Sequence, residues 1–282
     1  MIINKEEGII VLILKNCTKS FKKTKALNDF SCEFKHGIYG LLGPNGSGKT
    51  TMMRCICGLL SPEKGSIKCD CENIGYLPQQ FGAMKSLTVY ETMRYFATLK
   101  KIPKSNQDNG IRYCIDLVNL SDKIKNKVGS LSGGMVRRLG IAQAIMGNPE
   151  IVLFDEPTAG LDPEERVRFK SLLRKIKNDK TIIISTHIVS DVKSICDEIV
   201  IINEGRNVVQ GTCSDITSIG NEKVFLLDEE YENNLEGNYY VKDRISKDNK
   251  NYIIVLSSNF IEQGVSINAD IEDGYLCALK DI

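Results

Sequence analysis

The sequence predicts an α/β fold in which a mainly parallel β-sheet is surrounded by helices. Two observations support this prediction. Apolar runs of strand length alternate with helical patterns as far as about residue 215. Several of these runs are β-branched and apolar at nearly every position, as in parallel strands that are covered on both faces. The predicted strands cover residues 9–16, 30–34, 38–42, 74–77, 151–154, 181–185 and 199–203.

A helical insertion interrupts this alternation. Between Gln80 and Gly147 the strand pattern is absent, and the sequence favours helices at 89–100, 111–120 and 133–146. We expect this block, about 81–147, to be a helical subdomain within a larger domain that spans 1–217.

The chain after Thr217 has a different composition. It is rich in Asn, Glu and Lys and carries short alternating strand patterns, such as residues 252–256. We predict a small appended unit of α/β or β type over 218–282, and the sequence indicates no function for it.

Composition and charge exclude several classes of protein. With 42% hydrophobic residues among 282, the chain can bury a substantial core. Its 37 basic and 36 acidic residues give none of the positive excess that would indicate binding to a phosphate backbone, so no nucleic acid is expected as a partner. No run approaches the roughly 18 to 20 apolar residues that cross a bilayer. The first seven residues show no targeting or lipidation pattern, so we expect a cytoplasmic location.

Ten cysteines are many for this length. Without a secretion signal, we expect them to be free thiols in a reducing compartment. The pairs Cys55/Cys57 and Cys69/Cys71 leave a metal site as a minor alternative, because zinc sites usually place two to four residues between paired cysteines.

A glycine-rich loop follows the predicted strand at 38–42 and precedes a helical stretch at 51–59. This is the context that the pattern G-x-x-x-x-G-K-[ST] requires. The glycines let backbone N–H groups turn inward toward phosphate oxygens, and the helix N-terminus adds partial positive charge. Lys49 is expected to reach the β- and γ-phosphates, and Thr50 to offer its hydroxyl to Mg²⁺. The predicted phosphate-binding residues are Gly43, Pro44, Asn45, Gly46, Ser47, Gly48, Lys49, Thr50 and Thr51.

Two acids end the apolar run at 151–154. Asp155 lies at the carboxyl end of a predicted parallel strand, where ligands bind in such sheets, and is expected to hold Mg²⁺. Glu156 beside it can act as the general base for an attacking water. The phosphate loop alone would also suit a kinase, a GTPase or a recombinase.

The segment Leu131-Ser132-Gly133-Gly134-Met135 stands upstream of this acidic pair. Here the chain resembles the ABC ATPases, whose signature has the form L-S-G-G-Q and precedes the second Walker motif. The resemblance runs from about Leu12 to Gly211. It implies a P-loop NTPase core of ABC type, with a mostly parallel sheet plus an antiparallel β part.

Four further residues match motifs of this family. By resemblance, Phe21 stacks on adenine, Gln79 senses Mg²⁺ and the attacking water, and His187 contacts the γ-phosphate. Asp162 matches the D-loop that crosses between paired subunits. From the residues alone, Phe21 remains open to a role in core packing, Gln79 to a surface amide and His187 to a helix cap.

Met135 departs from the family pattern, which has glutamine there. Together with the sequence around Arg137 and Arg138, it resembles the branch of ABC-2, multidrug or peptide exporters. The resemblance implies an ATP hydrolase with Mg²⁺ as cofactor, held by Thr50, Gln79 and Asp155. It also implies an ATP-dependent homodimer, or a heterodimer with a similar subunit. In that dimer, Ser132, Gly133, Gly134 and Met135 of one chain close over ATP on the other.

The same resemblance implies separate transmembrane permease subunits as partners and a peripheral location on the inner face of the cell membrane. Two alternatives stay open. One is a soluble ABC ATPase of repair, translation or assembly, although the spacing of Lys49 and Asp155 leaves no room for a long coiled coil. The other is a non-hydrolysing nucleotide switch, which the presence of Glu156 and His187 disfavours.

Overall fold

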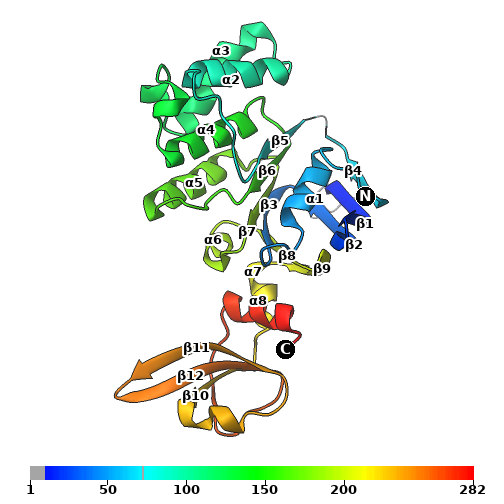
Figure 1. Cartoon of the computed structure of the whole chain (residues 1–282), viewed down its shortest axis with the longest axis vertical. Helices are drawn as coiled ribbons and strands as arrows, with labels where there is room; N and C mark the ends of the chain where they lie inside the picture. Colours follow the sequence, from blue (N-terminus) through cyan, green and yellow to red (C-terminus); the bar gives the residue numbers. More distant parts are fainter. Residues whose placement is uncertain (1–9, 72) are drawn as a thin grey trace, which may run out of the picture.

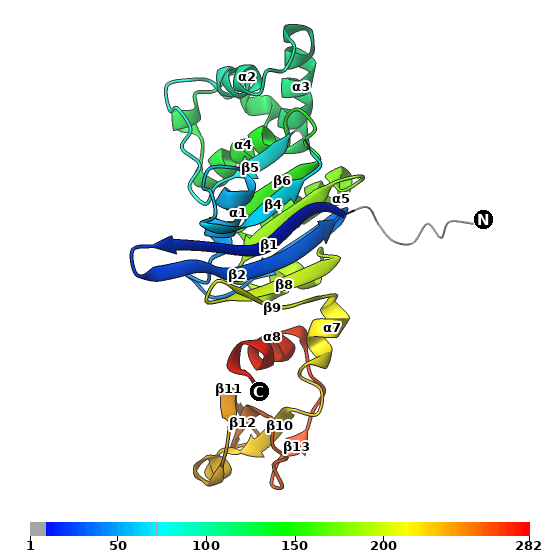
Figure 2. The same cartoon turned by 90° about the vertical axis from the view of Figure 1, so that its right-hand side faces the viewer.

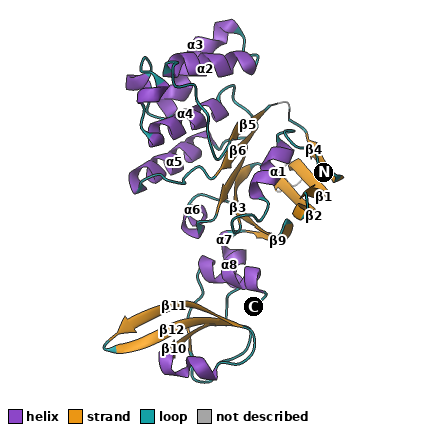
Figure 3. Cartoon of the chain, in the orientation of Figure 1, coloured by secondary structure: helices purple, strands orange, loops and turns teal. Residues whose placement is uncertain are grey.

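The computed structural model of the protein describes residues 10–71 and 73–282. Two expectations fall outside this range. One concerns the first seven residues, for which no targeting pattern was expected, and the other is the first residue of the strand predicted at 9–16. Helices gather at one end of an elongated molecule, two sheets lie in the middle, and a further sheet lies at the other end (Figures 1 and 3).

The central sheet has the strand order β5-β6-β7-β3-β8-β9. The first five of these strands run parallel, and β9 pairs with β8 antiparallel. The predicted α/β fold with a mostly parallel sheet is therefore confirmed. The strands are β3 (Gly37–Leu42), β5 (Ile74–Leu77), β6 (Ile151–Asp155), β7 (Thr181–Thr186), β8 (Glu198–Asn203) and β9 (Arg206–Gly211).

Both faces of this sheet are covered, which explains the continuous apolar runs. Val152 and Phe154 on β6 pack into the core beneath the helices. Ile151 and Leu153 on the same strand pack on the opposite face, toward α1 (Lys49–Ile56) and the antiparallel sheet. Successive side chains of a strand point to opposite faces, so residues 151–154 of β6 are apolar on both faces.

An antiparallel sheet covers the second face, in the order β2-β1-β4. It comprises β1 (Ile10–Phe21), β2 (Thr24–Lys35) and β4 (Lys64–Cys69). The strands predicted at 9–16 and 30–34 were too short, because β1 and β2 continue into a hairpin whose tip extends beyond the central sheet (Figure 2). The tip is rich in lysine and lacks an apolar pattern, so its strand character was missed, as were β4 and β9.

The helical subdomain contains α2 (Val89–Leu99), α3 (Lys104–Leu117) and α4 (Gly133–Ile145), with short 3-10 helices at Ser121–Lys123 and Val128–Ser130. Helix α3 begins at Lys104, well before the predicted start at 111. The prediction missed its first two turns because they are polar and mostly solvent-exposed, and so carry no apolar pattern. The remaining helices of the core are α1 (Lys49–Ile56), α5 (Pro163–Ile176) and α6 (Val189–Lys193). Across residues 10–71 and 73–282, none of the helices is both long and apolar enough for a bilayer span.

The C-terminal part forms its own antiparallel sheet, ordered β11-β12-β10-β13, which we call the accessory sheet. Helix α8 lies between it and the core (Figure 1). A Cβ atom on Gly274 of α8 would lie 1.8 Å from the Ile216 carbonyl oxygen of α7, so only glycine permits this approach. The predicted boundary at 217/218 falls in the last turn of α7. The elements are α7 (Cys213–Ser218), β10 (Val224–Asp228), β11 (Tyr239–Lys247), β12 (Lys250–Ser257), β13 (Val265–Ser266) and α8 (Ile271–Lys280), with a 3-10 helix at Glu229–Asn234.

The cysteines differ from expectation at one pair. Cys69 and Cys71 form a disulfide, so the prediction of free thiols is wrong for these two. Strand β4 ends at Cys69, and the chain then turns so that the two Cα atoms lie 5.4 Å apart, within bridging range. The other eight cysteines, including Cys55 and Cys57, are free thiols.

Candidate functional site

Strand register brings the predicted motifs to one edge of the central sheet. Leu77 pairs with Phe154, Asp155 with Ser185, and Leu42 with Thr186, so that β5, β6, β7 and β3 end at the same level. The segments that follow these strands hold Gln79, Glu156, His187 and the phosphate loop. Parallel strands collect ligand-binding residues at their carboxyl ends in this way.

The phosphate loop forms one wall of a pocket of about 260 Å³. Gly48 has φ of 114°, and a Cβ atom there would lie 2.2 Å from the Ala26 carbonyl oxygen, so the turn into α1 requires glycine. The buried Lys49 ammonium group donates hydrogen bonds to the carbonyl oxygens of Gly43 at 2.7 Å and Pro44 at 3.0 Å. The pocket is lined by Ala26, Asn45, Gly46, Gly48, Lys49, Thr50, Thr51, Gln79 and Glu156.

Burial lowers the pKa of Lys49, and the negative charges of Glu156 and Asp155 partly oppose this shift. The ammonium group has only backbone carbonyls as hydrogen-bond acceptors in the described structure. Bringing phosphate oxygens to Lys49 would replace these neutral partners with charged ones, which form stronger hydrogen bonds.

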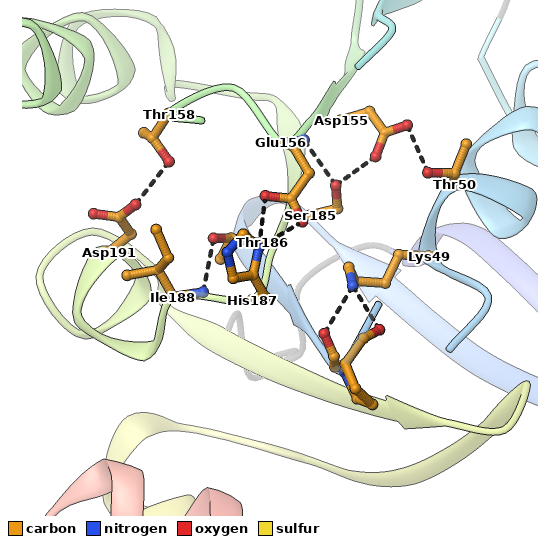
Figure 4. A network of polar contacts seen from close by, with 12 residues as sticks. Lys49, Thr50, Asp155, Glu156, Thr158, Ser185, Thr186, His187, Ile188 and Asp191 are labelled. Atoms are coloured by element: carbon orange, nitrogen blue, oxygen red, sulfur yellow. Dashed lines mark hydrogen bonds and ion pairs between the residues drawn. The ribbon is translucent and has the colours of Figure 1, made fainter. Parts of the chain in front are cut away.

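A second group of side chains joins α1 to β6 and β7. The Thr50 hydroxyl donates to one Asp155 carboxylate oxygen at 2.8 Å, and the Ser185 hydroxyl donates to the other at 2.6 Å (Figure 4). Ser185 also accepts the Glu156 backbone N–H at 2.9 Å. Hydroxyl, carboxylate and amide oxygens are the ligands that Mg²⁺ prefers. Thr50, Asp155 and the nearby Gln79 therefore fit the predicted metal.

Glu156 and His187 form the third element of the site. His187 Nδ1 lies 3.2 Å from both carboxylate oxygens of Glu156 (Figure 4). The Glu156 side chain is 8% exposed, whereas that of His187 is 49% exposed at the rim. Glu156 adopts the left-handed backbone conformation with φ of 49°, which is rare outside glycine and recurs at functional sites. This conformation places a carboxylate in the same pocket as Lys49.

The signature segment, residues 131–135, starts α4 away from this pocket. Ser132 caps the helix by accepting the Met135 backbone N–H at 3.3 Å. Ser132 and Gly133 are exposed, and Gly134 and Met135 are half-buried. None of these four is among the described residues that line the phosphate-loop pocket. The structure thus groups the loop, Gln79 and Glu156, and leaves the signature segment outside the lining of this pocket.

Two other predicted site residues also stand apart from the pocket lining. Phe21 ends β1 at the hairpin tip with 47% of its surface exposed, and the Lys19 ammonium lies 5.9 Å from its ring centroid. Asp162 caps α5 by accepting the Glu165 backbone N–H at 2.8 Å. Their predicted roles involve adenine and a second subunit.

Sequence reasoning assigned no role to three residues at the site. Ser185 lies in a predicted strand, and its contact with Asp155 follows from register. Asp191 on α6 accepts a hydrogen bond from Thr158 at 2.7 Å, which fixes the segment after Glu156. Arg137 follows the signature segment and reaches the carbonyl of Glu156. Of the three, only Arg137 could have been noticed in the sequence, because it is a cation inside a mostly apolar helix.

Comparison with known proteins shows the family to which the chain belongs. The family model for ABC transporters matches residues 27–159. The chain is 31% identical over 269 residues to YxlF, an uncharacterized ABC transporter ATP-binding protein of Bacillus subtilis, and the match covers 92% of this chain and 90% of the relative. It is also 34% identical to the Nod factor export ATP-binding protein I of Burkholderia lata, over 70% of this chain and 69% of that protein.

A solved structure with the same fold is a dimeric ATP-binding cassette in a post-hydrolysis state, bound to ADP and Pi. It has 26% sequence identity and a TM-score of 0.65, and the match covers 71% of this chain and 98% of that one. Fold and site define an ATP-binding cassette. The chain belongs to the ATP-binding proteins of ABC transporters, as the signature segment predicted.

Proposed function

We propose that this chain binds and hydrolyses ATP as the motor subunit of an ABC exporter. The observation that carries the proposal is one pocket lined by Lys49, Thr50 and Glu156, with the Asp155 carboxylate accepting a hydrogen bond from Thr50. A cation, a hydroxyl and a carboxylate at that spacing supply phosphate binding and general-base catalysis together. The sequence similarity to a Nod factor export protein supports the direction of transport.

Each residue has a distinct proposed role. The loop from Gly43 to Thr51 binds the phosphates, and Phe21 stacks on adenine. Thr50, Asp155 and Gln79 would hold Mg²⁺, which would supply neutralisation of the charge that develops on the phosphates. Glu156 accepts a proton from the attacking water, while His187 orients the Glu156 carboxylate and contacts the γ-phosphate.

Two subunits are proposed to pair head to tail. The exposed Ser132 and Gly133 cannot serve the pocket of their own chain, because the structure places them outside its lining. A second copy would supply them in trans, and the D-loop residue Asp162 would lie where the two subunits meet. Similarity to a dimeric cassette supports this arrangement. We also propose that the ATPase domain spans 1–217 and that 218–282 is an accessory region.

Substitution of Met135 tests whether this position of the signature segment accepts the glutamine that is usual in the family. Its half-buried side chain packs against the core of the helical subdomain. We expect Met135→Gln to retain ATPase activity within about 5-fold, because an uncharged side chain of similar length fits the same space. Steady-state phosphate release measures this. Complete loss of activity would show that the thioether packs in a role that glutamine cannot fill.

Separate membrane subunits are proposed to dock on the helical subdomain, which would place the chain on the inner face of the cell membrane. Of the apolar residues there, Val89 and Met93 are buried in the subdomain's own core. Met84, Tyr95 and Leu99 are instead 41%, 45% and 59% exposed. Apolar side chains of this kind form the centre of protein interfaces.

This docking predicts a membrane-bound pool of the protein. In the native host, we expect most of the tagged chain in the membrane fraction, and Tyr95→Asp to shift it to the soluble fraction with ATPase activity kept. Val167→Asp is the matched control, since Val167 is 62% exposed on α5, outside the subdomain. A wholly soluble protein that co-purifies with ribosomes or DNA would favour the soluble ATPase alternative instead.

A further inference from the structure

Arg137 connects three segments of the site through one side chain. It lies two residues after the signature segment, on the first turns of α4. Its Nη1 donates to the carbonyl oxygens of Pro78 at 3.1 Å and Gln79 at 2.8 Å. Its Nη2 donates to those of Asp155 at 2.7 Å and Glu156 at 2.5 Å, and its Nε donates to Pro157 at 3.2 Å.

Only a guanidinium group matches this set of acceptors. The group is planar and presents donors on three nitrogen atoms in a fixed fork, so Nη1 can serve the segment after β5 while Nη2 and Nε serve the end of β6 and the residues after it. A lysine in the same place has a single nitrogen with three protons. It would reach some of the five carbonyl oxygens and leave others without a donor.

The contacts with Glu156 bear on its unusual backbone. A non-glycine residue at φ of 49° carries a backbone cost that contacts with its surroundings can offset. Here the Ser185 hydroxyl accepts the Glu156 N–H, and the Arg137 guanidinium donates to the Glu156 carbonyl oxygen. The backbone of the catalytic carboxylate is thus held from both sides, once by β7 and once by α4.

Helix α4 also packs tightly on β5, the strand that leads to Gln79. A Cβ atom on Gly140 would lie 2.7 Å from a Leu77 methyl carbon, and one on Gly75 would lie 2.1 Å from the Ala144 carbonyl oxygen. The first contact is with a side chain and the second with backbone, and both leave little room for α4 to slide on β5. A displacement at the start of α4 is therefore passed to the Gln79 segment.

We infer that Arg137 is a positioning residue that links the signature segment to Gln79 and Glu156 within one subunit. The inference rests on the head-to-tail pairing proposed above. In such a pair, the signature segment contacts the ATP of the partner subunit, whereas Gln79 and Glu156 contact the ATP of their own. Arg137 then makes the catalytic geometry of one ATP site depend on whether the other holds ATP.

The test compares Arg137→Met, Arg137→Lys and the control Arg112→Met. Arg112 lies on α3 with its side chain 62% exposed and paired with Asp108. Three quantities are measured: the Kd of a fluorescent ATP analogue, the steady-state kcat and KM for ATP, and MgATP-dependent dimer formation in a Glu156→Gln background. Thermal unfolding checks the fold of each variant.

We expect Arg137→Met to lower kcat at least about 10-fold while Kd and KM stay within about 3-fold, the pattern of a lost transition-state contribution. The dimer should need roughly 10-fold more protein to form, because the signature segment is no longer held in register. Arg137→Lys should be intermediate, and Arg112→Met should match the wild type. If Arg137→Met does not fold, Arg137→Lys decides the question.

Two results would overturn the inference and leave the proposed function intact. One is a kcat within twofold of wild type for Arg137→Met, while Glu156→Gln remains inactive. The other is loss of ATP binding in parallel with activity, which would make Arg137 a structural residue of the pocket. By contrast, a wild-type protein without ATPase activity, or an active Glu156→Gln variant, would refute the proposed function itself.

Discussion

Replacing Lys49 with alanine is expected to reduce ATP turnover by about 100-fold or more in a protein that still folds. Lys49 supplies the one ammonium group among the described residues that line the phosphate-loop pocket. Charge-assisted bonds from such a group to phosphate oxygens are strong and are lost entirely in the variant. The measurement is kcat/KM for ATP, together with the Kd of a fluorescent ATP analogue.

The control for this prediction is Lys175→Ala, which removes an exposed ammonium group from α5. It should leave turnover unchanged. Alanine removes the donor to the carbonyl oxygens of Gly43 and Pro44 and a cation near Glu156 and Asp155, so the unfolding temperature should fall somewhat, and thermal unfolding separates this effect from the loss of turnover. Normal ATPase activity in well-folded Lys49→Ala protein would be incompatible with the proposed site.

Glu156→Gln is expected to lower hydrolysis on the order of 10²- to 10⁴-fold while ATP still binds. The amide keeps the shape of the carboxylate and can bond to His187, but it cannot accept a proton from water. With ATP bound and not hydrolysed, closed dimers should accumulate. Single-turnover kinetics and size-exclusion chromatography with MgATP measure the two effects separately.

Glu164→Gln serves as the control, since Glu164 is exposed on α5 and pairs only with Arg168. It should hydrolyse ATP normally and remain monomeric under the same conditions. Should Glu156→Gln protein run as a monomer with MgATP and hydrolyse at the wild-type rate, the head-to-tail mechanism would not apply to this chain.

The buried parallel strands were predictable because both of their faces are covered. Residues such as Ile151 and Phe154 must all be apolar, and this leaves a continuous run in the sequence. The hairpin of β1 and β2 was predictable only in part. Leu27, Phe30 and Phe34 face the core, but the lysine-rich tip has no buried face and so no pattern. The first turns of α3 were missed for the same reason, because they are polar and have no buried face.

The site divides in a similar way. Gly43 to Thr50, Asp155 and Glu156 form contiguous motifs, so the local spacing of residues is enough to predict them. Contacts made by Arg137, Ser185 and Asp191 join residues far apart in the sequence, and only strand register and helix packing create them. The disulfide between Cys69 and Cys71 was missed because composition and compartment, rather than local geometry, guided that expectation.

Helix α8 packs on the core through one apolar cluster and on the accessory sheet through another. Ile216 and Tyr275 share an apolar cluster with Val192 and Ile199 of the core, and Gly274 permits the close approach. A rotation of the central sheet would therefore carry α8 with it. Displacement under rotation grows with distance from the axis. The accessory sheet, at the far end of the molecule (Figure 1), would act as a lever arm that turns a small angular change into a larger linear sweep.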